Sequence, residues 1–247
     1  MTELEVLQIT DLAGLRRLTP ADFSGRCMSR AEFEHIFQLC RAFWAFDYAS
    51  DPGSQPHAIL TAGGHSDGFI NCLKVFSYPE LLEIFAAELA RTIRINYGVQ
   101  VDWVVGSAYA AITLGQRVAA MLGSRSHCTE KGRDADGHEI QVWSRFTIEP
   151  DEVVLDVEEL MTTATTALRV LRGISAAHED SINFAPIIAT LVDRREKFAD
   201  VFVDGSRVVS SFRYDNIQVW QPSECPLCPA GSKAVRHKQL WDKFSKS

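Results

Sequence analysis

One stretch decides the fold: Val153-Val-Leu-Asp-Val-Glu-Glu-Leu-Met-Thr-Thr-Ala-Thr-Thr-Ala167. Its apolar, β-branched start predicts a buried strand over 152–157. Two adjacent carboxylates, Glu158 and Glu159, end that strand, and a hydroxyl-rich turn leads into a helix expected over 162–171. Ligands of α/β sheets usually lie beyond the carboxyl ends of the strands, so this turn is a candidate binding site.

The chemistry of this turn points to a sugar phosphate. Free backbone N–H groups at a helix start, together with threonine hydroxyls, can hold a phosphate. Glu158 and Glu159 would repel that phosphate, so they would bind vicinal sugar hydroxyls, or a magnesium ion bridging them, on the same ligand. The alternative is that both are surface acids and that 162–166 is a plain helix cap.

Strands and helices alternate on both sides of this stretch. This order predicts an α/β fold with a central, mostly parallel sheet flanked by helices. The N-terminal region to about 47 is expected to be helical, because Ser29 and Glu32 have capping-box spacing and apolar residues follow at helical intervals to Trp44. The other expected elements are strands at 101–105, 140–148 and 184–192, helices at 81–97 and 112–122, and a charged loop at 123–137.

Composition excludes several classes of protein. The chain has 247 residues, 46% hydrophobic and 23% charged, which is ordinary for a folded domain. No apolar run approaches the ~20 residues of a membrane-spanning helix, and the start does not resemble a signal peptide. A net charge of −7 disfavours nucleic acid as a partner. Six cysteines without a secretion signal indicate a cytoplasmic protein with reduced thiols.

Three parts are expected along the chain. A loop containing Asp51-Pro-Gly-Ser54 and Pro56 marks the first boundary. Residues 1–56 are then a helical hood or dimer arm, 57–231 the core, and 232–247 a basic tail. A solvated tail is the preferred interpretation over a nucleic-acid-binding arm.

The quoted stretch resembles the phosphoribosyl pyrophosphate signature of the type I phosphoribosyltransferases, which is an apolar strand, two acids, two apolar residues, Thr-Thr-Gly and further hydroxyl residues. Ala164 stands where the family usually has glycine, and alanine there is expected to narrow or tilt the phosphate cradle. The matching residues are Glu158, Glu159, Thr162, Thr163, Thr165 and Thr166.

The resemblance extends over roughly 57–231 and is greatest to orotate phosphoribosyltransferases. Gly63, Ser66 and Phe69 match the segment that shapes the pyrimidine site, where Phe69 would stack on the base. The alternative for Phe69 is a core position. The departures in this segment are Thr61 in place of lysine, Ala62 in place of serine and Ile70 in place of a second aromatic residue.

Two further segments resemble the parts that bind pyrophosphate. Gly106, Ser107 and Ala108 match the pyrophosphate loop, although Ala110 and Ala111 replace a glycine pair. Without a ligand this loop would be a tight strand-to-helix turn. The second segment resembles the flexible catalytic loop, in which Lys131 is the matching lysine and Arg133 could assist it. A surface loop is the alternative there.

Two motifs remain. Arg194 resembles the family's arginine that faces the carboxylate of orotate, and the alternative is an ion pair with Asp193 or Glu196. The motif Cys225-Pro-Leu-Cys228 is half of a zinc site. Because His127, Cys128 or His237 would complete it only by chance, we expect a plain turn rather than zinc.

The resemblance implies a pentosyltransferase that moves ribose 5-phosphate from phosphoribosyl pyrophosphate to a base, with an orotate-like pyrimidine as the expected acceptor. It implies catalytic roles for Lys131, Glu158 and Glu159, magnesium that enters with phosphoribosyl pyrophosphate, and a homodimer. The rival is a sensor or regulator that binds this ligand or a nucleotide without turnover, since several loop positions depart from the family. A purely structural or interaction protein would not need an acid pair beside a threonine cradle.

Overall fold

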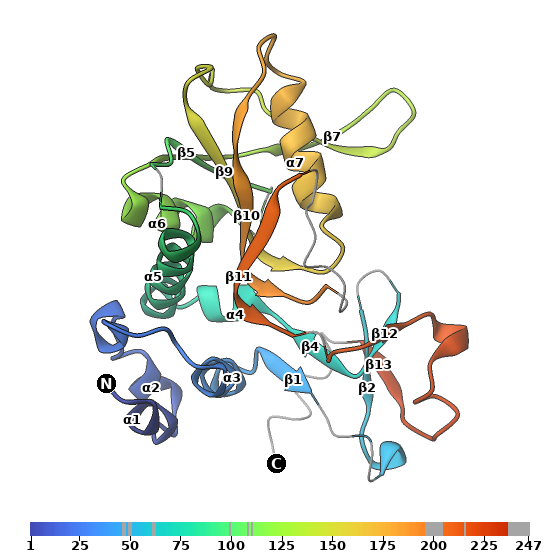
Figure 1. Cartoon of the computed structure of the whole chain (residues 1–247). Helices are drawn as coiled ribbons and strands as arrows, with labels where there is room; N and C mark the ends of the chain where they lie inside the picture. The colour runs from blue at the N-terminus through green and yellow to red at the C-terminus, as the bar shows by residue number, and fades with distance from the viewer. Residues whose placement is uncertain are drawn as a thin grey trace. The chain divides into compact units, whose positions relative to one another are not determined.

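The computed structural model describes residues 1–45, 48, 51–60, 63–98, 100–107, 109, 111–195, 205–214 and 216–236 (Figure 1). The chain forms two compact units. Unit 1 comprises Met1–Leu15, Ser29–Val75 and Asp215–Ser247, and unit 2 comprises Arg16–Met28 and Phe76–Tyr214. This division follows other boundaries than the three parts expected from the sequence. Those three parts stay a prediction.

Unit 2 is built on a five-stranded sheet in the order β11-β10-β9-β5-β6. All four strand pairs are parallel, which confirms the predicted α/β class. The long β9 occupies the middle of the sheet, so the acid pair lies on its central strand. The strands are β5 (Trp103–Gly106), β6 (Arg125–Cys128), β9 (Val153–Met161), β10 (Asn183–Asp193) and β11 (Arg207–Arg213).

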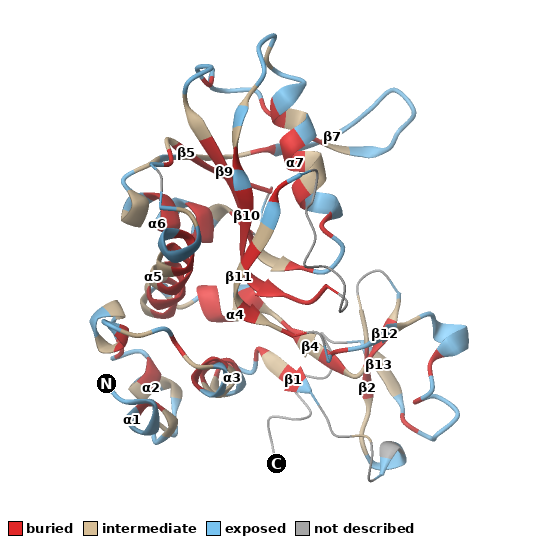
Figure 2. Ribbon diagram, viewed as in Figure 1, coloured by how far each residue is buried: buried red, intermediate tan, exposed pale blue. Residues whose placement is uncertain are grey.

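Helices cover both faces of this sheet. In Figure 1, α5 (Pro79–Asn96) and α6 (Ile112–Leu122) lie on one side and α7 (Thr165–Ser175) on the other. The residues coloured as buried lie along the central strands and on the helices that cover the sheet (Figure 2). Helix α6 occupies the predicted range, and it ends because Gly123 adopts a left-handed conformation with φ 76°.

A hairpin packs on α7 where the sequence indicated a loop. Strands β7 (Glu130–Arg133) and β8 (Glu139–Val142) pair antiparallel, with Lys131 opposite Gln141. The predicted loop over 123–137 is therefore wrong, since it contains β6 and β7, and the strand predicted over 140–148 ends at Val142. Gly173 of α7 permits this packing, because a Cβ atom there would lie 2.1 Å from the carbonyl oxygen of Gln141.

Unit 1 contains short helices and short strands. Strands β1 and β4 pair antiparallel, and a second sheet has the order β12-β3-β2-β13. Part of the predicted tail is structured, since β13 pairs parallel with β2; residues 237–247 lie outside the described residues. The elements are α1 (Glu3–Leu7), α2 (Leu12–Leu15), α3 (Arg30–Leu39), β1 (Phe43–Ala45), β2 (His57–Ile59), β3 (His65–Ser66), β4 (Gly68–Ile70), β12 (Val219–Trp220) and β13 (Ala234–Arg236), with α4 (Cys72–Phe76) at the boundary.

Helix α3 (Arg30–Leu39) begins where the sequence predicts a helix start but ends earlier than predicted. Ser29 and Glu32 form the capping box, with the Glu32 N–H donating to the Ser29 hydroxyl. The backbone turns at Arg41, whose φ is 54°, and the next residues form β1. The extension of this helix to Trp44 is therefore wrong. Among the described residues, no helix combines the length and apolar character that crossing a membrane requires.

Candidate active site

The acid pair lies near the carboxyl end of β9. Strand β9 runs past Glu158 and Glu159 to Met161, so the acids lie inside the strand rather than at its last residue as predicted. Its neighbours are β10 and β5, and Glu158 lies opposite Thr190 of β10. The pair therefore lies at the carboxyl edge of the sheet, where α/β proteins bind ligands.

Glu158 is a buried acceptor with one oxygen free for a ligand. The Ser107 hydroxyl donates to Glu158 Oε2 over 2.9 Å, and the side chain is 4% exposed. Its other oxygen, Oε1, has no hydrogen-bond partner among the described residues. Burial, followed by the negative neighbours Asp156 and Glu159, raises the pKa of Glu158 well above its usual value. A ligand hydroxyl would satisfy Oε1 and stabilise the carboxylate.

Burial shifts the other acids in the same direction. It raises the pKa of Glu159 to about 7 and the pKa of Asp156 well above its usual value. Asp156 was missed in the sequence analysis, although an acid inside the apolar run of 153–157 was a visible signal. Because strand residues alternate between faces, Asp156 shares a face with Glu158. Groups with such raised pKa values are typical of functional sites. A bound cation, or hydroxyl groups that donate hydrogen bonds, would favour the ionised form of these three carboxyl groups.

The threonine turn contains a left-handed residue, a conformation that glycine adopts more readily than alanine. Ala164 is the N-cap of α7 and adopts a left-handed conformation, φ 59° and ψ 4°. That conformation costs an alanine about 1–2 kcal/mol. The turn hydroxyls are close together, since Thr163 Oγ1 and Thr165 Oγ1 are 3.0 Å apart. The missing glycine has therefore not removed the left-handed step ahead of α7.

One pocket of unit 2 gathers most of the predicted phosphate and ribose residues. It has a volume of about 210 Å³. The Lys131 ammonium group belongs to its wall and lies 5.7 Å from the ring centre of Tyr109. The predicted residues that line it are Ser107, Lys131, Glu158, Glu159 and Thr162 to Thr166, including Ala164.

The turn after β5 is tightly packed. A Cβ atom on Gly106 would lie 2.7 Å from the Val157 carbonyl oxygen and 2.9 Å from the Ala111 Cβ, so this position requires glycine. Tyr109 has a positive φ of 76°, an uncommon conformation for a bulky residue. Ala108 and Ala110 lie outside the described residues, so their predicted roles stay predictions.

The predicted base-binding residues divide between the two units. Gly63 forms the turn between β2 and β3 with φ 88°, and the Ser66 hydroxyl lies 2.7 Å from the Gln218 carbonyl oxygen. Phe69 is partly buried against Trp44 and Ala58. Ile70 is buried, whereas Thr61 and Ala62 lie outside the described residues. These residues belong to unit 1, and their contact with a base stays a prediction.

Arg194 belongs to unit 2 and directly follows β10. Its side chain is 9% exposed, and its backbone N–H donates to the Met161 carbonyl oxygen over 2.8 Å. The neighbouring Arg195 holds Asp193 through Nε and a terminal nitrogen, each 2.9 Å from a carboxylate oxygen. Arg194 is thus anchored beside the last residue of β9, at the edge of the sheet that carries the acid pair.

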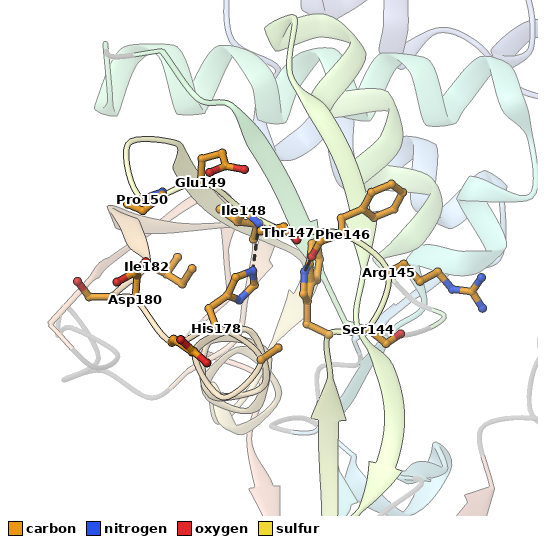
Figure 3. A pocket seen from close by; sticks show the side chains of 14 residues that line it. Ser144, Arg145, Phe146, Thr147, Ile148, Glu149, Pro150, His178, Asp180 and Ile182 are labelled. Atoms are coloured by element: carbon orange, nitrogen blue, oxygen red, sulfur yellow. Dashed lines mark hydrogen bonds between the residues drawn. The ribbon is translucent and has the colours of Figure 1, made fainter.

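A larger pocket, of about 400 Å³, lies at the opposite ends of β9 and β10 (Figure 3). Its central side chain, His178, accepts the Ile148 backbone N–H at Nε2 over 3.0 Å and donates from Nδ1 to the Ile174 carbonyl oxygen over 2.8 Å. Both ring nitrogens are therefore engaged with backbone. The His178 imidazole therefore holds two loops together. The smaller pocket, whose glutamates have raised pKa values, is the better candidate active site.

The fold and the smaller pocket, which contains Glu158 and Glu159, together define a type I phosphoribosyltransferase. No protein-family model matches the chain. The orotate phosphoribosyltransferases of Caldanaerobacter subterraneus and Thermoanaerobacter sp. are 31% and 30% identical to it over 180 residues, which cover 73% of this chain and 87% of each relative. The chain belongs to the orotate phosphoribosyltransferase family.

Solved structures support the fold alone. The crystal structure of orotate phosphoribosyltransferase from Aeropyrum pernix has a TM-score of 0.55 at 16% identity, covering 73% of this chain and 93% of that one. The structure of Leishmania donovani UMP synthase has a TM-score of 0.53 at 15% identity, covering 87% of this chain and 42% of that one.

Proposed function

We propose that this protein transfers ribose 5-phosphate from phosphoribosyl pyrophosphate to orotate and releases pyrophosphate. The observation that carries the proposal is the pocket in which the buried Glu158 and the half-buried Glu159 lie beside a threonine turn, a serine and a lysine. The relatives named orotate phosphoribosyltransferase support orotate as the acceptor.

The threonine turn would hold the 5-phosphate. Thr162, Thr163, Thr165 and Thr166 offer hydroxyls, and the first backbone N–H groups of α7 have no partner inside the helix. The positive end of the helix dipole favours a dianion at this position.

The acid pair would bind the ribose hydroxyls and stabilise the sugar as it becomes cationic. Glu158 Oε1 is the acceptor that a ribose hydroxyl would satisfy. When the bond from C1 to pyrophosphate breaks, positive charge develops on the ring, as in glycoside cleavage. Carboxylates held in a buried site interact with that charge more strongly than carboxylates in water. Glu158 and Glu159 would therefore favour the transition state over the neutral ground state.

Lys131 and the turn after β5 would receive the pyrophosphate. Lys131 supplies positive charge, and the backbone at 106–107 is tightly packed at the end of β5. Magnesium would enter bound to phosphoribosyl pyrophosphate, and the carboxylate and hydroxyl oxygens of the pocket are ligands suited to such a hard cation. The Arg194 guanidinium would pair with the carboxylate of orotate.

The test is an assay of phosphoribosyl transfer against a panel of free bases. We expect orotate to be consumed in the presence of magnesium and phosphoribosyl pyrophosphate. Glu158→Gln should reduce kcat by about two orders of magnitude or more, because the charge that stabilises the cationic sugar is lost. Glu179→Gln, the same change at an exposed glutamate outside this pocket, is the matched control and should leave activity unchanged.

Two outcomes would contradict the proposal. Consumption of a purine but not of orotate would overturn the assigned acceptor while leaving the phosphoribosyl half in place. Binding of phosphoribosyl pyrophosphate without turnover of any base would favour the sensor expected as the rival. The homodimer and the cytoplasmic location stay predictions, and light scattering during gel filtration would check the first.

A further inference from the structure

Four side chains that can bind a metal meet in unit 1, away from the acid pair and threonine turn. His57 and His65 come from β2 and β3, and Cys225 and Cys228 from the loop between β12 and β13. Their four ligand atoms all lie within 4.8 Å of one another. His57, His65 and Cys225 are buried, with exposed fractions of 0%, 8% and 4%. The geometry points to a structural zinc site of the Cys2His2 type.

The spacing of the ligand atoms fits a tetrahedral zinc ion. Bond lengths of about 2.0–2.1 Å to nitrogen and about 2.3 Å to sulfur place two nitrogens about 3.4 Å apart and a nitrogen and a sulfur about 3.6 Å apart. The structure has 3.1 Å between His57 Nε2 and His65 Nδ1. Each cysteine sulfur lies 3.5 Å from His57 Nε2, and Cys228 Sγ lies 3.3 Å from His65 Nδ1.

Hydrogen bonds alone do not account for this cluster. The Ser232 hydroxyl donates to the Gln55 carbonyl oxygen over 2.6 Å, so it accepts from His57 Nδ1, 2.8 Å away. In the neutral ring this leaves His57 Nε2 with one lone pair and no proton. Three other groups of the cluster lie 3.1–3.5 Å from that nitrogen, yet it can accept only one hydrogen bond. One metal ion would satisfy all four groups.

The hydrogen bond from His57 to Ser232 is of the kind that orients metal-binding histidines. A histidine that binds zinc normally donates its other N–H to a polar group, which fixes the tautomer and the ring orientation. Ser232 and Gln55 provide this for His57 through a buried hydroxyl. The free lone pair of the ring is thereby directed at the cluster.

The fold gives the site a structural purpose. Strands β2, β3, β12 and β13 contain two or three residues each. Their associated apolar cluster is small, with Trp44 and Ala58 as its buried members. Such a small core supplies little free energy, and small folds compensate with metals or disulfides. Zinc would fasten the hairpin of 57–66 to the segment of 219–236.

This inference replaces the plain turn expected at Cys225 and Cys228. The partners considered from the sequence were His127 and Cys128, which belong to unit 2, and His237, which lies outside the described residues. The partners in the structure are His57 and His65, at least 160 positions away from the cysteines. The inference is independent of the proposed function, because zinc content does not depend on turnover.

The test is metal analysis of the full chain, purified without a histidine tag. We expect one zinc per chain by mass spectrometry. X-ray absorption should show two sulfur neighbours at about 2.3 Å and two nitrogen neighbours at about 2.0 Å. A parent protein without zinc that also fails to bind added Zn²⁺ or Co²⁺ would overturn the inference, and so would a zinc shell made of oxygen and nitrogen only.

Variants then assign the ligands. Cys228→Ser and His65→Ala should each lose most of the zinc, whereas His65→Cys should keep it, since zinc also binds three cysteines and one histidine. Cys27→Ser, an exposed cysteine of unit 2, is the matched control and should keep one zinc. If Cys228→Ser and His65→Ala retain the zinc of the parent, these residues are not its ligands.

Discussion

At the scale of single residues, Ala164 shows how the backbone can keep a shape that its sequence disfavours. The sequence indicated a lost glycine, and glycine is the residue that adopts positive φ without cost. The structure nevertheless has φ 59° at Ala164. Ala164 is 7% exposed and packs in the cluster of Met161, Ala167 and Leu171. This burial offsets part of the conformational cost.

Ala164→Gly should therefore change little. Glycine removes the cost of a left-handed alanine, which stabilises the folded state by about 1–2 kcal/mol. Loss of the buried methyl group costs about 0.8 kcal/mol, and the greater conformational freedom of the unfolded chain costs about 0.4–1 kcal/mol. The free energy of unfolding, measured in urea, should stay within about 1 kcal/mol of the parent. Titration calorimetry should show unchanged affinity for phosphoribosyl pyrophosphate. A gain of about tenfold or more would show that the alanine distorts the cradle.

Glu159 should make stability depend on pH in a defined window. Its pKa rises from 4.5 to about 7 on folding, so the folded protein binds more protons between these values and loses stability as pH rises through them. Glu159→Gln removes the part of this dependence that Glu159 contributes, whereas Asp156 and Glu158 keep theirs. The free energy of unfolding of the variant should equal that of the parent near pH 4.5 and exceed it by about 3 kcal/mol above about pH 7. Urea denaturation across this range measures the difference, and a difference independent of pH would contradict the assignment.

At the scale of elements, the sequence predicted what periodicity and caps encode. The range of α6 follows from its apolar spacing and from Gly123 behind it. Strands β6 and β7 read Arg-Ser-His-Cys and Glu-Lys-Gly-Arg, without the apolar alternation that marks a strand, so tertiary pairing decides them. The acid pair was found because it is local in sequence. The partners of Cys225 and Cys228 were not, because only folding brings distant strands together.

The contact between α7 and β8 should control the position of Lys131. In Gly173→Ala the new methyl would lie 2.1 Å from the Gln141 carbonyl oxygen, so the hairpin must shift. Overpacking costs about 1–3 kcal/mol, more than the ~1 kcal/mol that alanine gains in a helix. Because Lys131 lies opposite Gln141, the KM for phosphoribosyl pyrophosphate should rise as well. The control is Ser175→Ala at the exposed end of α7, and equal kinetics for both variants would show that the hairpin does not position the lysine.

At the scale of the whole molecule, each unit has its own candidate site. Unit 2 holds the pocket with the acid pair, and unit 1 holds the Cys2His2 cluster. Each site can thus be probed by a different ligand, a phosphorylated sugar or a metal ion.

Phosphoribosyl pyrophosphate with magnesium should stabilise the protein through unit 2. At about 100 times its dissociation constant the ligand adds about 2.7 kcal/mol to the free energy of unfolding. Hydrogen exchange should show new protection at 162–168, where the first N–H groups of α7 would bind the phosphate. Thr163→Val should remove most of both effects, because a turn hydroxyl is lost. Protection that appears in the parent without any change at 162–168 would place the ligand elsewhere.

The division of unit 1 into separate stretches of chain also has a consequence in time. The ribosome makes about 5–20 residues per second, so the more than 160 residues between His65 and Cys228 take on the order of 10–30 s to synthesise. Throughout that interval the two histidines exist without the cysteines, and β2 lacks its partner β13. Unit 2, apart from Arg16–Met28, is one continuous stretch and is complete at Tyr214. During translation, therefore, unit 2 can fold before the two cysteines have been made, and a metal ion held by all four side chains can bind only after Cys228 has been synthesised.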